Sequence, residues 1–320
     1  MLKIIDFTES HIEQALIIAK ENYESERKSI DILPMNIDFP DLSPFAKNGL
    51  GVSAFAGDKM VGYLCCYGPF KQAFRSTKAI GVWSPIHGNG IIDCEHKNVF
   101  ARMYQEAAIK WVNLKATSHA ITFYTHNNLI KNQLYRYGFG LRCIDTIREM
   151  QEIKTNDNPK YTISELEHNE FHLIFPIGLL LVKHLSNSPS FMRYPEDKIK
   201  KGHEYKFAEW QIKEKYRYFA AKDGEKIIAY VKVHDEGENF IGDVNNMKHI
   251  HGAYCFPEYR GQGIIQSIIN FIIKKLRTED NQLLGVDFES LNPTADNFWL
   301  KYFKEYTQSV VRRIDDLFIK

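Results

Sequence analysis

The chain has 320 residues, of which 44% are hydrophobic, 25% charged and 13% aromatic. This length suits two domains of about 150 residues better than one hydrophobic core. A formal net charge of +1 provides no global field that would attract nucleic acid or an anionic membrane, so we expect neither partner.

The N-terminal segment and the cysteines indicate where the protein resides. MLKIIDFTESHIEQ contains no apolar signal core. The five cysteines form neither a disulfide framework nor a set with metal-ligand spacing: Cys65, Cys66, Cys94, Cys143 and Cys255. We therefore expect a cytoplasmic protein with reduced thiols and no metal site.

The first half is predicted to contain, in order, a hairpin, a glycine-containing turn, a helix and two strands. Turn residues Gly57 and Asp58 separate two apolar segments within residues 54–64, which predicts the hairpin. The segment 87–92 reads His-Gly-Asn-Gly-Ile-Ile, and we expect a helix to begin near Lys97. Strand-like segments follow at 120–124 and 144–150, and an aromatic helix after Asn128 lies between them.

The second half follows a polar segment, residues 154–160, that is typical of a linker. The apolar run 171–185 contains His172, Pro176, Lys183 and His184 and is too short to span a bilayer, so we expect a buried helix. A hairpin with an Asp223-Gly224 turn, a strand over 250–256 and a helix from Ile264 come next. The strand-like segment 283–288, an aromatic helix after Asn292 and the run 310–317 complete this half.

The two halves thus carry the same landmarks in the same order. Arg260-Gly261-Gln262-Gly263-Ile264-Ile265 occupies the place that residues 87–92 have in the first half. This internal repeat predicts one domain over residues 1–150 and a second over 161–320. The alternative is a single large α/β domain.

The segment 249–277 carries the strongest chemical signal. Pro257 cannot donate to a β-ladder and therefore ends the strand before it. Gly261 and Gly263 flank the start of a helix whose first amides have no internal partner, and the helix dipole adds positive potential there. Because glycine lets a diphosphate approach the backbone and Arg260 offers a permanent charge, this turn suits a phosphate-bearing ligand.

The run Phe256-Pro-Glu-Tyr-Arg-Gly-Gln-Gly-Ile264 resembles motif A of the GNAT superfamily of acetyltransferases, usually Arg/Gln-x-x-Gly-x-Gly/Ala. Arg260 and Gly263 match this motif, and Ile265 stands where Gly or Ala is usual. The segment 292–301 resembles motif B, with Trp299 in place of the usual tyrosine and no glycine after Lys301.

This resemblance implies an α/β fold of the α+β type, with two tandem acyl-CoA N-acyltransferase (GNAT-like) domains, each a mixed twisted sheet flanked by helices. It also implies that two central strands separate and that pantetheine bonds the exposed strand edge at Tyr254, Cys255 and Phe256. The diphosphate of acetyl-CoA, or of another acyl-CoA, would lie on Arg260 and on the amides of Gly261, Gln262, Gly263, Ile264 and Ile265. Asn292 occupies the strand-end position from which the cofactor is also bonded.

Acyl transfer to an amine requires that a proton be removed, because an aliphatic amine has a pKa near 10. Asp287 and Glu289 share one side of their predicted strand, and His249 and His251 share one side of its neighbour. We favour Glu289 or His251 as the base. For the acid, the family position carries Trp299, which leaves Tyr302, one helical turn further along, as the candidate. Direct attack by the amine needs no nucleophile, so Cys255 is expected to be a strand residue.

The leading hypothesis is therefore transfer of an acyl group, acetyl first of all, to an amine of a small molecule or peptide. The alternatives are a catalytically silent acyl-CoA-binding or sensing protein, and aminoacyl or other acyl transfer by a tandem relative of the superfamily. In the first domain His87 replaces Arg260, so that domain is expected to be degenerate. The segment 189–210, with Phe191, Tyr194 and Trp210, is expected to cover the acceptor. The oligomeric state cannot be predicted.

Overall fold

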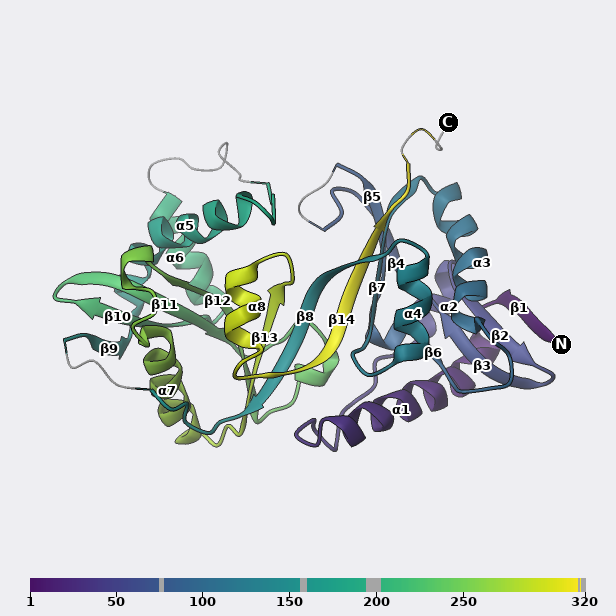
Figure 1. Cartoon of the computed structure of the whole chain (residues 1–320), viewed down its shortest axis with the longest axis horizontal. Coiled ribbons are helices and arrows are strands. Elements are labelled where there is room, and N and C mark those ends of the chain that lie inside the picture. Colours follow the sequence, from purple (N-terminus) through teal and green to yellow (C-terminus); the bar gives the residue numbers. More distant parts are fainter. Residues whose placement is uncertain (75–77, 156–159, 194–202, 316, 318–320) are drawn as a thin grey trace. The chain divides into compact units, whose positions relative to one another are not determined.

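A computed structural model describes residues 1–74, 78–155, 160–193, 203–315 and 317. The chain separates into two compact units (Figure 1). The first comprises Met1–Asp145, Phe288–Leu291 and Lys304–Lys320, and the second comprises Thr146–Asp287 and Asn292–Phe303. The division into domains 1–150 and 161–320 stays a prediction. The compact units place the C-terminal segment Lys304–Lys320 in the first unit.

The first unit contains two sets of paired strands. One set has the order β1-β2-β3-β6 and is antiparallel throughout, with β1 (Leu2–Asp6), β2 (Val52–Ala56), β3 (Lys59–Leu64) and β6 (Asn89–Ile91). The other has the order β4-β5-β7-β14, with β4 (Tyr67–Phe70), β5 (Ile80–Ser84), β7 (Ala116–Tyr124) and β14 (Lys304–Arg313). In this second set β5 and β7 are parallel, whereas β14 is antiparallel to β7.

Helices cover the sheets of the first unit: α1 (Ile12–Ser29), α2 (Ser43–Asn48), α3 (Val99–Asn113) and α4 (Asn128–Arg136). Two short 3-10 helices, η1 (Glu9–His11) and η2 (Ile86–Gly88), complete this unit. One core contains Phe100, Met103 and Trp111 of α3 against β2 and β7, and a second contains Ile18 of α1 and Phe45 of α2. The chain leaves this unit within β8 (Gly140–Glu149).

The second unit has the strand order β13-β12-β11-β10-β9. The strands are β9 (Thr162–Glu165), β10 (Arg217–Asp223), β11 (Lys226–His234), β12 (Met247–Cys255) and β13 (Leu283–Glu289). Only β12 and β13 are parallel to each other in this set. The helices are α5 (Ile174–Ser186), α6 (His203–Lys213), α7 (Ile264–Arg277) and α8 (Pro293–Trp299), with 3-10 helices η3 (His168–Leu173), η5 (Phe240–Gly242) and η6 (Pro257–Tyr259).

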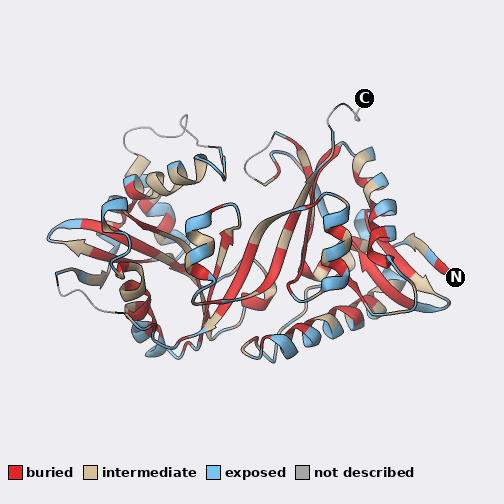
Figure 2. Cartoon of the chain, viewed as in Figure 1, coloured by how far each residue is buried: buried red, intermediate tan, exposed pale blue. Residues whose placement is uncertain are grey.

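Successive side chains of β10 point to opposite faces of this sheet, and helices pack against both faces. Tyr218 and Ala220 belong to a core with α5 and α6, whereas the ring of Phe219 lies 6.2 Å from that of Phe271 on α7. In Figure 2 the strands of this unit are mostly red, whereas α7 also carries tan residues in its first turns and blue residues in its last turns. Isoleucines at helical spacing give α7 its buried face: Ile264, Ile268, Ile269, Ile272 and Ile273.

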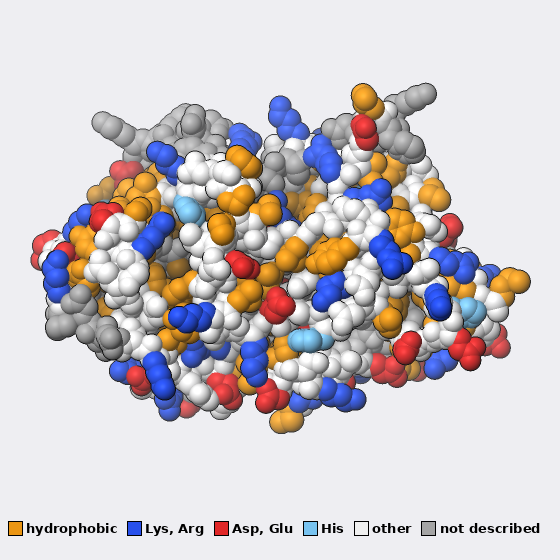
Figure 3. Space-filling model, in the orientation of Figure 1, with side chains coloured by type: hydrophobic (Ala, Val, Ile, Leu, Met, Phe, Trp, Pro, Cys, Tyr) orange, Lys and Arg blue, Asp and Glu red, His pale blue; other side chains and the backbone are white. Residues whose placement is uncertain are grey.

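Several predicted elements are confirmed within a few residues. Both hairpins form, as β2–β3 and β10–β11, and α3 begins at Val99, two residues after Lys97. The predicted strand over 250–256 is β12, and the helix from Ile264 is α7. In the described part of the chain no helix is both long and apolar enough to cross a membrane. Figure 3 shows basic and acidic side chains interspersed over one face, as the small net charge suggests.

Two expectations were wrong in detail. The His87–Gly90 segment is not a turn before a helix, because Ile86–Gly88 is a 3-10 helix and Asn89–Ile91 is the buried strand β6. The run 171–185 forms η3 and α5, but among α5 residues only Ile174 and Ile177 are fully buried. The other apolar side chains of α5 are partly or wholly exposed, so only one side of this helix lies in the core that it shares with β10 and β11.

Candidate functional site

The two central strands of the second unit separate halfway along β12. Pairing with β13 ends at Ile250 opposite Val286, whereas pairing with β11 continues to Cys255 opposite Ala229. Residues 251–255 therefore present one strand edge that no described strand pairs. This is the separation that the family resemblance implied, and it exposes backbone donors and acceptors to a ligand.

The turn that follows β12 carries a row of amides without acceptors. Gly261 and Gly263 have φ angles of 76° and 77°, a left-handed conformation that glycine adopts without a Cβ penalty. Gly263 is the N-cap of α7, and no side chain caps this helix. Within the described part of the chain, no residue accepts a hydrogen bond from the amides of residues 261–265. Amides of this kind at a helix N-terminus form an anion-binding concavity.

A pocket of about 310 Å³ joins the free strand edge to these amides. Its walls come from β12, from the turn before α7, from the start of α8 and from α5. The predicted cofactor residues that line it are Tyr254, Cys255, Arg260, Gly261, Gly263, Ile264, Ile265 and Asn292. All of them belong to the second unit. The structure thus brings together residues from both GNAT-like motifs, which lie about 30 positions apart in the sequence.

Arg260 and Cys255 have distinct environments in this pocket. The Arg260 Nε donates to the Cys255 carbonyl at 3.0 Å, and its guanidinium carbon lies 5.7 Å from the centre of the Tyr254 ring. This leaves the terminal guanidinium nitrogens available for a phosphate. Burial raises the pKa of the Cys255 thiol to about 11, so it stays protonated at neutral pH. A protonated thiol is a poor nucleophile, which agrees with the expected strand role.

Two predicted cofactor residues do not line the pocket. The Phe256 amide donates to the Ile228 carbonyl at 3.1 Å, and its ring lies 5.0 Å from Lys226 Nζ. The Gln262 side chain accepts a hydrogen bond from the Tyr161 hydroxyl at 2.9 Å. Only the main chain of Gln262 can therefore contribute to the row of open amides. Roles for these two residues in cofactor binding remain predictions.

Glu289, predicted as a base, forms an ion pair with Arg142. Arg142 Nε lies 2.5 Å from one Glu289 carboxylate oxygen, and Arg142 Nη2 lies 3.1 Å from the other. Both residues belong to the first compact unit, and Glu289 does not line the pocket of the second. A carboxylate held by a guanidinium is a weaker base than a solvated one. The base role of Glu289 stays a prediction that this pairing does not favour.

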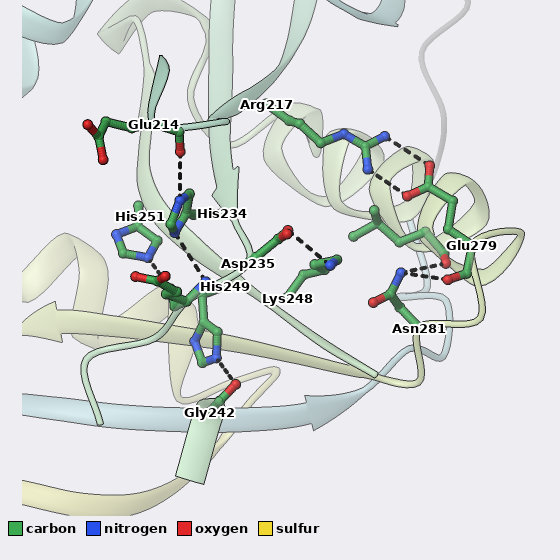
Figure 4. A network of polar contacts seen from close by, with 12 residues as sticks. Glu214, Arg217, His234, Asp235, Gly242, Lys248, His249, His251, Glu279 and Asn281 are labelled. Atoms are coloured by element: carbon green, nitrogen blue, oxygen red, sulfur yellow. Dashed lines mark hydrogen bonds and ion pairs between the residues drawn. The ribbon is translucent and has the colours of Figure 1, made fainter. Parts of the chain in front are cut away.

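The two predicted histidines of β12 donate to different carbonyls (Figure 4). His251 is the extra residue of a β-bulge opposite Lys232 and Val233, and its Nε2 donates to the Glu236 carbonyl at 2.6 Å. Burial lowers its pKa. His249 is buried, and its Nε2 donates to the Gly242 carbonyl at 3.3 Å. Neither side chain lines the pocket, so a base role for His251 remains a prediction.

Tyr302 reaches the pocket only through another side chain. Its hydroxyl accepts a hydrogen bond from Gln266 Nε2 at 3.3 Å, and Gln266 lines the pocket. Trp299, at the position of the family tyrosine, lines the pocket directly. Phe191 and Trp210 are largely exposed and do not line it. Tyr194 lies outside the described residues.

Sequence reasoning overlooked the contribution of α5. Leu181 and His184 line the pocket, and His184 Nε2 lies 3.2 Å from both Asn292 Oδ1 and Thr294 Oγ1. The sequence signal for this contribution is a histidine, His184, near the end of a predicted apolar helix. Thr294, Ala295 and Phe298 of α8 complete this wall.

The corresponding place in the first unit has a different chemical character. The loop between β6 and α3 lines a pocket of about 420 Å³ together with α4. Asp93 and Glu95 line this pocket, and their carboxylates would repel a diphosphate. No group of three or more His, Cys, Asp or Glu residues in the described ranges could hold a metal ion.

Comparisons with known proteins agree with this geometry. Residues 182–303 match the model of the acetyltransferase (GNAT) family. No curated protein matches the chain.

Among solved structures, a GCN5-related N-acetyltransferase from Sphaerobacter thermophilus is similar over 98% of this chain and 95% of its own, with 9% identity and a TM-score of 0.55. A GCN5-related glucosamine N-acetyltransferase region of a fungal multi-domain GH3 beta-N-acetylglucosaminidase covers 97% of this chain and 38% of its own, with 12% identity and a TM-score of 0.51. A tandem GNAT protein from the clavulanic acid biosynthesis pathway covers 98% of both chains, with 9% identity and a TM-score of 0.47.

The first two likenesses extend over nearly the whole chain and show its fold. The expected α+β fold of the GNAT type is therefore confirmed. We conclude that the chain has the fold of the GNAT acetyltransferases and that its residues 182–303 match the model of the acetyltransferase (GNAT) family.

Proposed function

We propose that the second unit binds acyl-CoA, acetyl-CoA first of all, and transfers the acyl group directly to an amine of a small molecule or peptide. The observation that carries this proposal is the row of amides at residues 261–265, which have no acceptor in the described structure and border the pocket. A diphosphate would satisfy these donors at once, and the start of α7 favours its negative charge.

The remaining residues of the pocket fit the same ligand. Arg260 would add a charge-assisted hydrogen bond to a phosphate oxygen. The unpaired edge of β12 at Ala253, Tyr254 and Cys255 offers peptide donors and acceptors to the pantetheine amides. A bound acyl-CoA would supply the activated acyl carbon as a thioester, and the protein would position that carbon and exclude water. The protonated Cys255 thiol supports direct transfer over a covalent intermediate on the enzyme.

A second candidate function is an acyl-CoA-binding or sensing protein without turnover. Trp299 favours this alternative, because an indole stands in the pocket where the family usually has a phenol. Turnover separates the two functions. Incubation with acetyl-CoA and a panel of primary amines should release free CoA thiol if the protein is an acyltransferase, whereas a sensor should bind CoA and release none.

The binding site itself is tested by reversing the charge at residue 260. In Arg260→Glu the new carboxylate would repel the diphosphate, so the affinity for CoA measured by calorimetry should fall at least about ten-fold. Circular dichroism should show an unchanged fold, because the Arg260 side chain is exposed.

Arg277→Glu is the matched control, since it makes the same charge reversal at the exposed opposite end of α7. Its affinity for CoA should stay within about two-fold of the unmodified protein. Equal affinities in Arg260→Glu and the unmodified protein would contradict a diphosphate site at this turn.

A further inference from the structure

Among the described residues that line the pocket, His184 is the one histidine. The other titratable residues of this described lining are Tyr254, Cys255, Tyr259 and Arg260, and none of the described lining residues is a carboxylate. Tyrosine, cysteine and arginine ordinarily titrate well above pH 7, whereas imidazole titrates near pH 6.5. The question is therefore which nitrogen of His184 carries the proton.

The hydrogen bonds of Asn292 fix the orientation of its amide. Asn292 is the N-cap of α8, and its Oδ1 accepts from the Thr294 amide at 3.3 Å. The Thr294 hydroxyl also donates to Oδ1, at 2.7 Å. Because a main-chain N–H can only donate, the atom that faces it is the amide oxygen and not the nitrogen.

The same contacts fix the tautomer of His184. Its Nε2 lies 3.2 Å from Asn292 Oδ1, an atom that can only accept, and 3.2 Å from Thr294 Oγ1. The single proton of the Thr294 hydroxyl is already donated to Asn292, so that oxygen also accepts. Nε2 must therefore carry the hydrogen, and in the neutral ring Nδ1 holds a lone pair.

Helix α5 brings His184 into the lining of the pocket, beside β12 and α8. Leu181, one helical turn before His184, is the side chain that a Cβ at Gly252 of β12 would meet, at 3.7 Å. His184 contacts the start of α8, which follows β13. The last turns of α5 thus contact both β12 and the start of α8, two walls of the pocket.

We propose that His184 carries the proton in acyl transfer and that Asn292 is its positioning residue, a step that rests on the function proposed above. As the new N–C bond forms, Nδ1 of His184 would accept the proton that the neutral amine loses. As the C–S bond breaks, the resulting imidazolium would return this proton to the departing sulfur. One proton moves from nitrogen to sulfur, and His184 returns to its initial state.

The described residues that line the pocket around His184 carry their titratable groups on one side of it. From β12 and the turn before α7, the facing titratable groups are Tyr254, Cys255, Tyr259 and Arg260. From the α8 side, the lining residues Asn292, Thr294, Ala295, Phe298 and Trp299 carry no titratable group. The neighbour of His184 on its own helix, Lys183, is exposed. A carboxylate at residue 292 would therefore be a new and adjacent charge.

Asn292→Asp tests the pairing without removing the N-cap, because Asp caps helices as well as Asn. Its carboxylate should stabilise the imidazolium, so the titration midpoint of His184 in the free protein should rise by about one pH unit. Imidazole ¹H–¹⁵N correlation spectra measure this midpoint and should also show the Nε2–H tautomer. His184→Gln assigns the resonance by its loss.

Activity provides the second measurement. The acidic limb of the kcat profile should move to higher pH by the same amount in Asn292→Asp, because less neutral imidazole is present at a given pH. His184→Gln should lower kcat by about 100-fold or more, because glutamine can donate to Asn292 but cannot accept and return a proton. Asn127→Asp, the same change at the N-cap of α4 in the first unit, should leave the midpoint and the profile unchanged.

The outcomes distinguish the two proposals. Full kcat in His184→Gln, an Nδ1–H tautomer, or an acidic limb that stays in place in Asn292→Asp would overturn the role of His184 alone. If the unmodified protein bound no CoA, or bound it without acyl transfer to any amine, the proposed function would fail and the role of His184 with it.

Discussion

His249 illustrates how a buried side chain can control stability rather than chemistry. Its ring occupies the space that a Cβ at Gly237, Gly242 or Gly285 would need, at distances of 2.4–2.5 Å. Larger residues at these three positions would therefore displace the imidazole. Burial lowers the pKa of His249 to about 4, so the ring is neutral at physiological pH and donates from Nε2 to the Gly242 carbonyl. Because the His249 ring is buried and hydrogen-bonded to the main chain, a substrate in solvent does not reach it.

The lowered pKa of His249 predicts a specific loss of stability in acid. His249 binds a proton below about pH 6.5 in the unfolded chain but only below about pH 4 in the folded chain. Its contribution to the free energy of unfolding is therefore present above about pH 6.5 and is lost as the pH falls from there towards about 4. His249→Gln keeps a donor for Gly242 but cannot titrate. The fall in the free energy of unfolding between pH 8 and pH 4.5 should therefore be smaller by about 2–3 kcal/mol in this variant, as measured by urea titration.

The control for this effect is His168→Gln, because His168 is exposed. Its pH dependence should follow that of the unmodified protein. Identical acid destabilisation in His249→Gln and the unmodified protein would show that His249 does not titrate between these pH values.

Helix α7, whose N-terminus is uncapped, is anchored at its middle. Asn270 is buried on this helix, and its side chain pairs with the main chain of Ile153. Its Oδ1 accepts from the Ile153 amide at 2.7 Å, and its Nδ2 donates to the Ile153 carbonyl at 2.7 Å. Asn270 thus provides the partners that a neighbouring strand would otherwise supply, which fixes α7 against the segment that follows β8.

Replacing Asn270 by leucine should leave two buried polar groups of Ile153 without partners. The expected loss is about 3 kcal/mol in the free energy of unfolding, seen as a lower urea midpoint at constant m. Lys274→Leu on the same helix removes only an exposed ion pair with Glu152 and should cost less than about 1 kcal/mol. Equal midpoints for the two variants would mean that the Ile153 groups find water instead.

The helices and strands that could be predicted from the sequence are those specified by patterns of neighbouring residues. Alternating apolar residues and turn residues indicated both hairpins, and helical spacing of isoleucines indicated α7 and its glycine start. The contact of His184 with Asn292 joins residues 108 positions apart, and no local pattern specifies such a pair. The ion pair of Glu289 with Arg142 is equally non-local, so the strand pattern showed the carboxylate but not its partner.

At the scale of the whole molecule, the chain returns to its first unit at its end. β14 pairs with β7 from Thr307 opposite Tyr124 to Arg313 opposite Ser118. The Thr307 hydroxyl donates to the buried Asp145 carboxylate, and Val310 lies in the core of the first unit. The internal repeat predicted a strand at the end of each half, but the β-propensity of a segment does not specify which strand it pairs with. The assignment of β14 to the first unit therefore required the three-dimensional structure.

Because β14 belongs to the first unit, we expect a C-terminal truncation to affect that unit first. A chain that ends at Phe303 would lack β14, and β7 would lose the hydrogen bonds of one edge although its residues are otherwise buried. Amides of β7 should therefore exchange hydrogen at least about ten-fold faster by mass spectrometry, whereas those of α7 and β11 in the second unit should keep their protection. A chain that ends at residue 315 retains β14 and the Ile314 amide bond to the Thr117 carbonyl, so it should match the full chain. Loss of a strand first exposes the strand with which it pairs, which here is β7. Faster hydrogen exchange confined to the second unit would therefore contradict the assignment of β14 to the first unit.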